Sequence, residues 1–139
     1  MNADKDIKTL DKIDATEPVY PEQELTGKIL ECAFTVHNAL GAGFLERVYS
    51  NALAHELQRS GIDCIREAPL KVRYKDVIVG DYVADILVAS RVLMELKACA
   101  ALDSNHAAQI MNYLRASGVR VGLLLNFGRP KLEYRRFVC

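Results

Sequence analysis

Several features that would place this sequence in a specialised class of protein are scarce or missing. It has no tryptophan, and its longest apolar runs, such as Val121–Phe127, fall far short of the roughly 20 residues that span a bilayer. Its polar, acidic start shows no basic segment followed by an apolar one, so we expect no secretory signal peptide. These absences predict a cytoplasmic protein that has no contact with a membrane.

Cysteine is present, but it is sparse and irregularly spaced. The four cysteines do not form the closely spaced pairs that are typical of zinc sites. Their scatter also gives no disulfide framework of the kind that small secreted proteins carry. We interpret them as free thiols in a reducing cytoplasm. They are Cys32, Cys64, Cys99 and Cys139.

Neither sign of charge dominates, because the 18 basic residues balance the 18 acidic ones. A net charge of zero argues against a protein that coats nucleic acid without specificity. The charges are nevertheless unevenly placed: residues 1–31 are rich in acids, whereas residues 111–139 are rich in arginine and contain a single acid, Glu133. A basic C-terminal third is compatible with phosphate binding and equally with a solvated surface, and the sequence leaves both open.

The length of 139 residues suits one domain with a sizeable core. Residues 1–22 lack an apolar period and predict a flexible acidic arm, followed by a single domain over residues 23–139. Apolar spacing predicts helices over 24–40, 44–60 and 103–116, and strands over 62–66, 70–74, 77–88, 92–98, 119–127 and 134–138. Thr26 is the expected cap of the first helix, and Asp103 or Ser104 that of the third. This order predicts an α/β fold with a mixed central sheet flanked by helices.

Charged side chains interrupt two of the predicted strands. Asp85 lies in one of them, and Glu95 and Lys97 lie in the next. A carboxylate on a buried strand is costly unless it is compensated, and a metal ion is one such compensation. Glu95 and Lys97 share a face because they are two residues apart. Asp85 joins that face only if the turn near residues 89–91 has an odd length or a bulge; the alternative is a hairpin with solvated or salt-bridged charges.

Two carboxylates with a lysine suit the hydrolysis of a phosphodiester bond. Asp85 and Glu95 would hold a hard divalent cation, Mg²⁺ or Mn²⁺, with water completing its coordination. The cation would stabilise charge on the scissile phosphate and lower the pKa of a bound water. Lys97 would orient that water or stabilise the transition state.

Two of the predicted helices carry further polar candidates. Glu46, early on the second helix, suits either a third acid at the site or a residue that complements the helix dipole. On the third helix His106, Gln109 and Tyr113 form one stripe. Gln109 would orient a water or a phosphate at the edge of the site. We interpret His106, near the helix start, as a capping or surface residue.

In their order and spacing, these residues resemble one protein family. Gly43-x-x-Glu46-x-x-Tyr49 matches the signature of the GxxExxY family, a compact branch of the PD-(D/E)XK nuclease-like superfamily. The resemblance extends over most of the chain through Ala84-Asp85, Glu95-Leu96-Lys97-Ala98, Gln109-x-x-Asn112-Tyr113-Leu114 and Leu125-Asn126-Phe127-Gly128. The chain departs from the common pattern at Val83, where a basic residue is usual, and at Ala107, where an acid is usual.

The resemblance implies a minimal restriction-endonuclease-like core that uses Mg²⁺ or Mn²⁺ to cleave DNA, with RNA as the second choice. It implies Asp85 and Glu95 as metal ligands, a backbone carbonyl near Leu96 as a further ligand, and Lys97 as the catalytic lysine. The remaining implied positions are Glu46 and Gln109 as catalytic residues, and Tyr49 and Tyr113 as accessory ones.

Two other functions stay open on the sequence. One is an inactive nuclease-fold module that binds nucleic acid through its C-terminal arginines, or assembles with partners, independently of Asp85 or Glu95. The other is a small protein whose acids are structural, in which case no metal ion would raise its stability. A homodimer would supply a second cutting site, although nothing in the chain specifies one.

Overall fold

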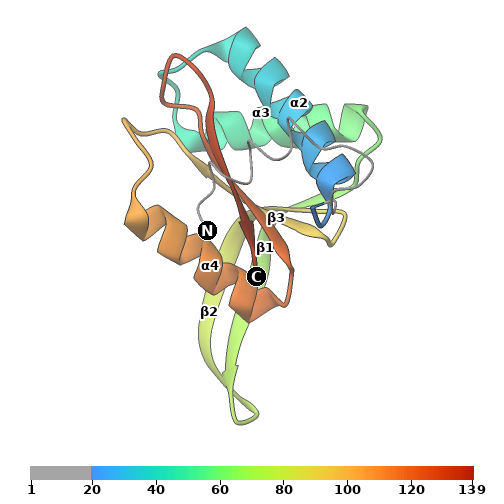
Figure 1. Cartoon of the computed structure of the whole chain (residues 1–139), viewed down its shortest axis with the longest axis vertical. Coiled ribbons are helices and arrows are strands. Elements are labelled where there is room, and N and C mark those ends of the chain that lie inside the picture. The colour runs from blue at the N-terminus through green and yellow to red at the C-terminus, as the bar shows by residue number, and fades with distance from the viewer. Residues whose placement is uncertain (1–19) are drawn as a thin grey trace.

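A five-stranded sheet lies at the centre of the computed structural model, which describes residues 20–139 (Figure 1). Across the sheet the strands follow the order β1 (Cys64–Tyr74), β2 (Val77–Val88), β3 (Val92–Lys97), β4 (Val121–Asn126) and β5 (Glu133–Val138). Neighbouring strands are antiparallel except β3 and β4, which are parallel. The sheet is therefore mixed, and the predicted α/β class is confirmed.

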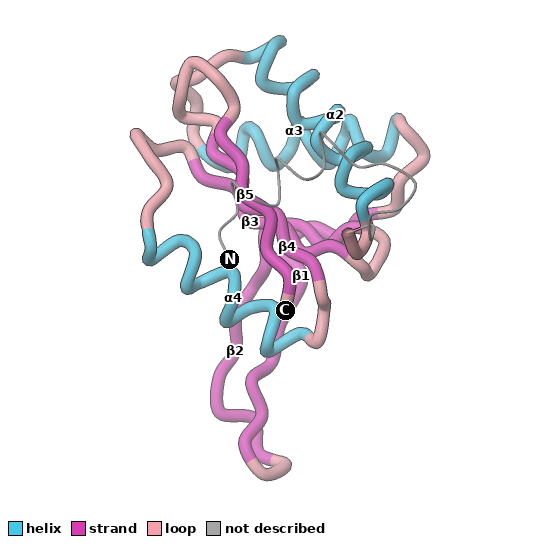
Figure 2. Tube along the Cα trace, viewed as in Figure 1, coloured by secondary structure: helices cyan, strands magenta, loops and turns pink. Residues whose placement is uncertain are grey.

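Helices pack on both faces of the sheet (Figure 2). The described helices are α2 (Gln23–Leu40), α3 (Glu46–Arg59) and α4 (Ser104–Ser117), and α4 joins the parallel strands β3 and β4. One core cluster lies between α2, α3 and the sheet and contains Met94; the other lies under α4 and contains Leu93. Consecutive strand residues point to opposite faces, so odd-numbered positions of β3 face α4. Within residues 20–139 no helix is both long and apolar enough to span a membrane.

The apolar run near the C-terminus forms the buried strand that its composition predicts. All of β4 is buried, as is usual for a strand covered on both faces. Gly122 allows α4 to approach this strand closely, because a Cβ there would lie only 3.0 Å from Ile110 Cδ1. The close packing of α4 on β4 fixes the position of the helix relative to the end of β3.

One strand replaces two that were predicted. Residues 62–66 and 70–74 fall largely within the single strand β1, although Glu67 between them has a φ of 52°. Pro69, which lies between the two predicted strands, has no backbone N–H to donate to a neighbouring strand. β1 is an edge of the sheet, however, and an edge strand tolerates such a residue.

The prediction that Thr26 caps the first helix is wrong. The helix begins at Gln23, and Thr26 is buried within it, with its hydroxyl donating to the Gln23 carbonyl at 3.1 Å. The Thr26 hydroxyl also accepts a hydrogen bond from Arg136, which is only 3% exposed. Arg136 therefore joins β5 to α2 and is not available to bind phosphate from solvent.

Arg136 also contacts the first described residues, Tyr20 and Pro21. The Arg136 guanidinium donates to the Pro21 carbonyl and lies over the Tyr20 ring at 5.2 Å from its centroid. The rest of the predicted acidic arm, residues 1–19, lies outside the described residues.

Candidate active site

The β2–β3 hairpin places the two predicted ligands opposite each other. Its turn consists of the three residues Ala89–Arg91, since β2 ends at Val88 and β3 begins at Val92. The register pairs Ile86 with Met94, and next to this pair the Asp85 N–H lies 3.2 Å from Glu95 Oε1, so the two acids are neighbours. The odd-length turn that a shared site requires is present.

The regular ladder of backbone hydrogen bonds between β2 and β3 stops at this pair. The Asp85 N–H donates to Glu95 Oε1 at 3.2 Å, and the Leu96 N–H donates to Asp85 Oδ2 at 2.7 Å. Carboxylate oxygens thus replace backbone carbonyls as the acceptors across the two strands. Each acid is thereby fixed in place by the neighbouring strand.

The electrostatics of the pair are unfavourable in the absence of a cation. Glu95 is 4% exposed, and its burial together with the negative charge of Asp85 raises its pKa to about 8. The Asp85 N–H and the more distant charge of Lys97 act in the opposite direction. Among residues 20–139 no ion pair involves either acid, so the salt-bridged alternative does not apply.

A hard divalent cation fits this pair of donors. Two neighbouring carboxylates supply oxygen ligands, and the charge of the cation would offset both the burial of Glu95 and the negative charge of Asp85, which together raise the Glu95 pKa. No group of three or more His, Cys, Asp or Glu side chains suited to a metal occurs in the described part of the chain. A cation would therefore rely on two carboxylates, a backbone carbonyl and water, which is the mode of binding that Mg²⁺ tolerates best.

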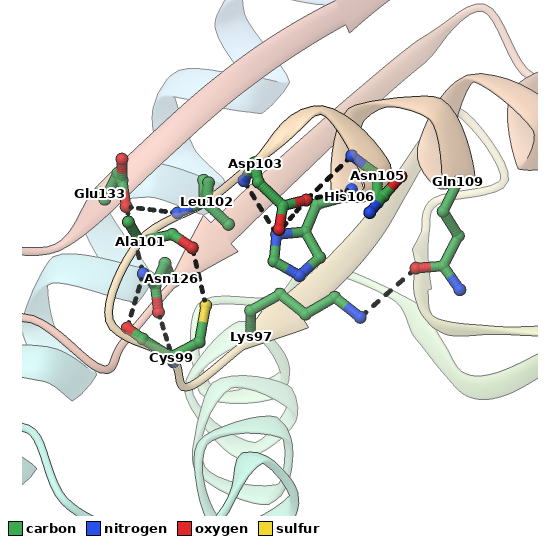
Figure 3. A network of polar contacts seen from close by, with 10 residues as sticks. All are labelled: Lys97, Cys99, Ala101, Leu102, Asp103, Asn105, His106, Gln109, Asn126 and Glu133. Atoms are coloured by element: carbon green, nitrogen blue, oxygen red, sulfur yellow. Dashed lines mark hydrogen bonds and ion pairs between the residues drawn. The ribbon is translucent and has the colours of Figure 1, made fainter.

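A chain of polar contacts joins β3 to α4. Lys97 Nζ donates to Gln109 Oε1 at 3.3 Å (Figure 3), and Gln109 Nε2 donates to the Tyr113 hydroxyl at 3.1 Å. Burial and the charge of Glu95 raise the pKa of Tyr113. The structure therefore brings together Glu95, Lys97, Gln109 and Tyr113, all of which were predicted site residues.

Glu46 reaches the site from the other side of the sheet. It lines a cavity of about 180 Å³ together with Asp85 and Leu96. The remaining lining residues are Arg47 and Ser50 from α3, and Arg66 and Glu67 from β1. Asp85 thus lies between two polar regions. One is the cavity under α3, which both acidic and basic side chains line, and the other is the set of polar contacts under α4.

Tyr49 acts on the site through the loop that precedes α3. Its buried hydroxyl donates to the Gly41 carbonyl at 2.6 Å and accepts from the Phe44 N–H at 3.1 Å. Its ring stacks on Phe127 at 4.7 Å. Gly43 in this loop has a φ of 119°, which side-chain-bearing residues rarely adopt. The Gly-x-x-Glu-x-x-Tyr spacing therefore fixes the point at which α3 begins, and with it the position of Glu46.

Asn126 was missed as a residue that supports the site. Its Oδ1 accepts from the N–H groups of Cys99 and Gly128, both at 3.0 Å, and its Nδ2 donates to the Cys99 carbonyl at 3.0 Å and to Glu133 at 3.1 Å (Figure 3). Figure 3 draws the contacts with Cys99 and Glu133 but not the one with Gly128, and together these contacts hold the segment that follows Lys97. A buried amide at the end of an otherwise apolar strand was the available signal.

Arg66 and Glu67 were also missed. They lie beside Asp85 in the 180 Å³ cavity, at the point where β1 departs from regular geometry. The only sign in the sequence was that Arg66 ends one predicted strand and Glu67 begins the break before the next.

The interpretation of His106 as a capping residue is confirmed. Asp103, one of the two expected caps, accepts from the N–H groups of Asn105 at 2.9 Å and His106 at 3.1 Å. His106 Nδ1 accepts in turn from the Asp103 N–H at 3.1 Å, which completes a capping box (Figure 3). These hydrogen bonds lower the pKa of Asp103.

Comparison with known proteins bears on the family and the fold of the chain. The family model described as the PD-(D/E)XK nuclease superfamily matches residues 23–137. Among solved structures, the one titled "Crystal structure of SSO0001" has a TM-score of 0.55 and 11% sequence identity, over 95% of this chain and 74% of that chain. At this identity the likeness concerns the fold alone. A search of curated proteins gives no match.

Proposed function

Because the chain belongs to the PD-(D/E)XK nuclease superfamily, we propose that it is a nuclease that hydrolyses phosphodiester bonds of DNA with the aid of Mg²⁺ or Mn²⁺. RNA is the second choice of substrate. The observation that carries the proposal is the opposed pair Asp85 and Glu95 at the end of the β2–β3 ladder, with Lys97 on the same face as Glu95.

The charge of the site supports a metal-dependent reaction. Two carboxylates alone would repel the phosphate of a nucleic acid, and the pKa of Glu95 is raised first by burial and then by the negative charge of Asp85. A bound divalent cation supplies charge stabilisation at the phosphate and a water of lowered pKa. Asp85 and Glu95 would hold it, and the backbone near Leu96 is the proposed source of a further oxygen ligand.

Lys97 is proposed to act on the phosphate or on the attacking water. Its side chain shares a face with Glu95, and its ammonium group donates to the side-chain amide oxygen of Gln109. An ammonium group held in this position would stabilise the negative charge that develops on the phosphate in the transition state. Glu46, across the cavity from Asp85, is proposed as an additional acid of the site.

Thermal unfolding with and without Mg²⁺ or Mn²⁺ tests the metal site. A ligand at about 100 times its dissociation constant stabilises the folded state by about 2.7 kcal/mol, so the unfolding temperature of the native chain should rise. Asp85→Asn keeps an oxygen that can accept from Leu96 but loses the charge, and it should not respond to the metal. Asp76→Asn is the matched control, because Asp76 lies at the far end of β2, about 30 Å away along an extended strand.

Cleavage of labelled DNA and RNA of one sequence, each single- and double-stranded, tests the reaction. Activity should require the metal and should be lost in Asp85→Asn and Glu95→Gln. Loss of a fixed donor to the transition state costs on the order of 100-fold or more, so Lys97→Gln should be slowed by at least that factor. Equal metal responses in native, Asp85→Asn and Asp76→Asn, or cleavage that persists in Asp85→Asn, would contradict the proposal.

One observation favours the second candidate function, a nuclease-fold module that binds nucleic acid without cleaving it. The Asp85 and Leu96 N–H groups already give the two carboxylates hydrogen-bond partners within the hairpin, so the pair can be held in place without a metal ion. Such a module would bind DNA equally well as the native chain and as Asp85→Asn, with no stabilisation by either metal.

A further inference from the structure

A groove lies between α4 and the long β1–β2 hairpin, outside the carboxylate pair. Figure 1 shows this hairpin extending beyond the rest of the sheet, with α4 beside its upper part. The groove has a volume of about 750 Å³. The side chains that matter for its chemistry are Lys71, Arg73, Tyr82, Gln109, Tyr113 and Arg115.

The groove is positively charged. Lys71, Arg73 and Arg115 line it, and no acidic residue is among the lining residues that the structure describes. Lys71 pairs with Asp81 at 2.6 Å in an exposed contact, and Arg115 donates to Asn112. The groove therefore attracts a polyanion, although the net charge of the whole chain is zero.

Two tyrosines form an aromatic surface at the groove. The rings of Tyr82 and Tyr113 lie 5.5 Å apart at an interplanar angle of 43°. Tyr113 is 8% exposed, whereas Tyr82 is 49% exposed. Tyr113 therefore supports Tyr82 from below, and much of the Tyr82 ring remains accessible to a flat ligand. Aromatic rings beside a positively charged groove are the recurring means of binding single-stranded nucleic acid.

The groove is continuous with the proposed catalytic residues. Gln109 and Tyr113 line it and hydrogen bond to each other. Gln109 also accepts from Lys97, which shares a face with Glu95. A strand that occupied the groove would therefore lead directly to the Lys97 side of the carboxylate pair.

We infer that this groove binds a single-stranded segment of the nucleic-acid substrate, with an unpaired base stacked on Tyr82 and neighbouring phosphates beside Arg73 and Arg115. The inference rests on the proposed function in that it places the strand next to Lys97. The volume is of the size that holds one compact ligand, which suits one or two nucleotides of a single strand. Because only an unpaired base can stack on the exposed Tyr82 ring, the preferred substrate on this inference is a single strand or an unpaired end.

Binding of a fluorescent oligothymidylate in EDTA tests the inference without metal binding or cleavage. The native chain should bind this single strand more tightly than a blunt duplex. Stacking contributes about 1–3 kcal/mol per base, so Tyr82→Leu should weaken binding by about 5- to 150-fold. Tyr82→Phe keeps the ring and should retain the native affinity.

Charge is tested by Arg73→Gln with Arg59→Gln as its control. Arg73→Gln should weaken binding. It should also reduce the slope of the logarithm of affinity against the logarithm of salt concentration by about 0.7, the value for one phosphate contact with a single strand. Arg59 is exposed at the end of α3 and does not line the groove, so its replacement should change nothing. The unfolding temperatures of all these variants, including Tyr82→Leu, should lie close to that of the native chain, because the replaced side chains are exposed or lie at the surface of the groove.

The result separates the groove from the catalytic proposal. Native affinity in both Tyr82→Leu and Arg73→Gln, or a preference of the native chain for duplex, would overturn the inference even if metal-dependent cleavage were established. Loss of dimerisation in Tyr82→Leu with unchanged DNA binding would also overturn it, because the surface would then be a contact between two copies. Loss of single-strand binding in both variants would support the groove even if no cleavage were found.

Discussion

The two sides of the Asp85–Glu95 pair are built differently. On the α3 side, buried rings and hydrogen bonds to the backbone hold the loop before Glu46, with Tyr49 stacked on Phe127. On the α4 side, the Lys97–Gln109–Tyr113 contacts are polar and open into the 750 Å³ groove. The first arrangement resists change, whereas the second is accessible to a substrate. We therefore expect substitutions on the α3 side to alter stability, and those on the α4 side to alter binding and catalysis.

The largest expected effect comes from the α3 side. Tyr49→Ala removes a fully buried ring and should lower the free energy of unfolding by about 3–5 kcal/mol, as measured by urea denaturation. Tyr49→Phe keeps the ring and loses only the hydroxyl contacts with Gly41 and Phe44, so it should cost less. If Tyr49→Ala lowered the free energy of unfolding by less than Tyr49→Phe, the proposed structural role of the ring would be contradicted.

Gly128→Ala should have the next largest effect. A Cβ at Gly128 would lie 2.4 Å from the backbone N of Cys99, so one of the two segments must move. Overpacking of this kind typically costs about 1–3 kcal/mol. Gly27→Ala is the control, because the exposed Gly27 in α2 has nothing within 4 Å of an added Cβ and alanine favours a helix by about 1 kcal/mol. Equal losses in both variants would show that the contact with Cys99 is unimportant.

The stability of the metal-free protein should depend on pH because the pKa of Glu95 is raised. Glu95 holds its proton more tightly in the folded protein, where its pKa is about 8, than at its ordinary value of 4.5. The metal-free protein should therefore be most stabilised by this group below pH 4.5 and lose that contribution as the pH rises to about 8. Unfolding temperatures in EDTA should fall over this range more steeply for the native chain than for Glu95→Gln. Parallel curves for the two proteins would refute the assignment.

The smallest expected effect on stability is that of Gln109→Ala. Gln109 is partly exposed, and its loss should change the free energy of unfolding by about 0.5 kcal/mol or less. Its effect on the proposed cleavage should be larger, because Lys97 would lose the oxygen that positions its ammonium group. Comparison of denaturation curves with cleavage rates measures both; a large loss of stability would place Gln109 with the scaffold.

Much of the fold could be predicted because its signals are local. Apolar periodicity identified the described helices, the end of β2 at Val88 and the buried strand β4. The superfamily predicted from the motifs is confirmed by the family model, while membership of the narrower GxxExxY group stays a prediction. The limits of β1 were missed because the tolerance of Pro69 depends on its position at a sheet edge, which is a property of the assembled sheet.

The candidate site was predictable in its members and less so in its arrangement. Asp85, Glu95 and Lys97 stood out as charges within apolar strands; in the structure Asp85 lies beside Glu95, and the charge of Lys97 acts on Glu95. The burial of Arg136 under α2 could not be foreseen, because the sequence does not reveal which of several arginines meets Thr26 and the Pro21 carbonyl. The groove residues Lys71, Arg73 and Tyr82 were equally hidden, since they become neighbours of α4 only in the folded chain.

The length of the Ala89–Arg91 turn has a consequence for comparing this protein with others. A strand pair whose connection is one residue shorter or longer would turn Asp85 to the opposite face, while every residue named in the motif remained present. The number of residues in the turn, rather than the identity of any one of them, thus determines whether the two acids are neighbours. Insertions or deletions within this turn should therefore separate active from inactive relatives more reliably than the presence of the acids themselves.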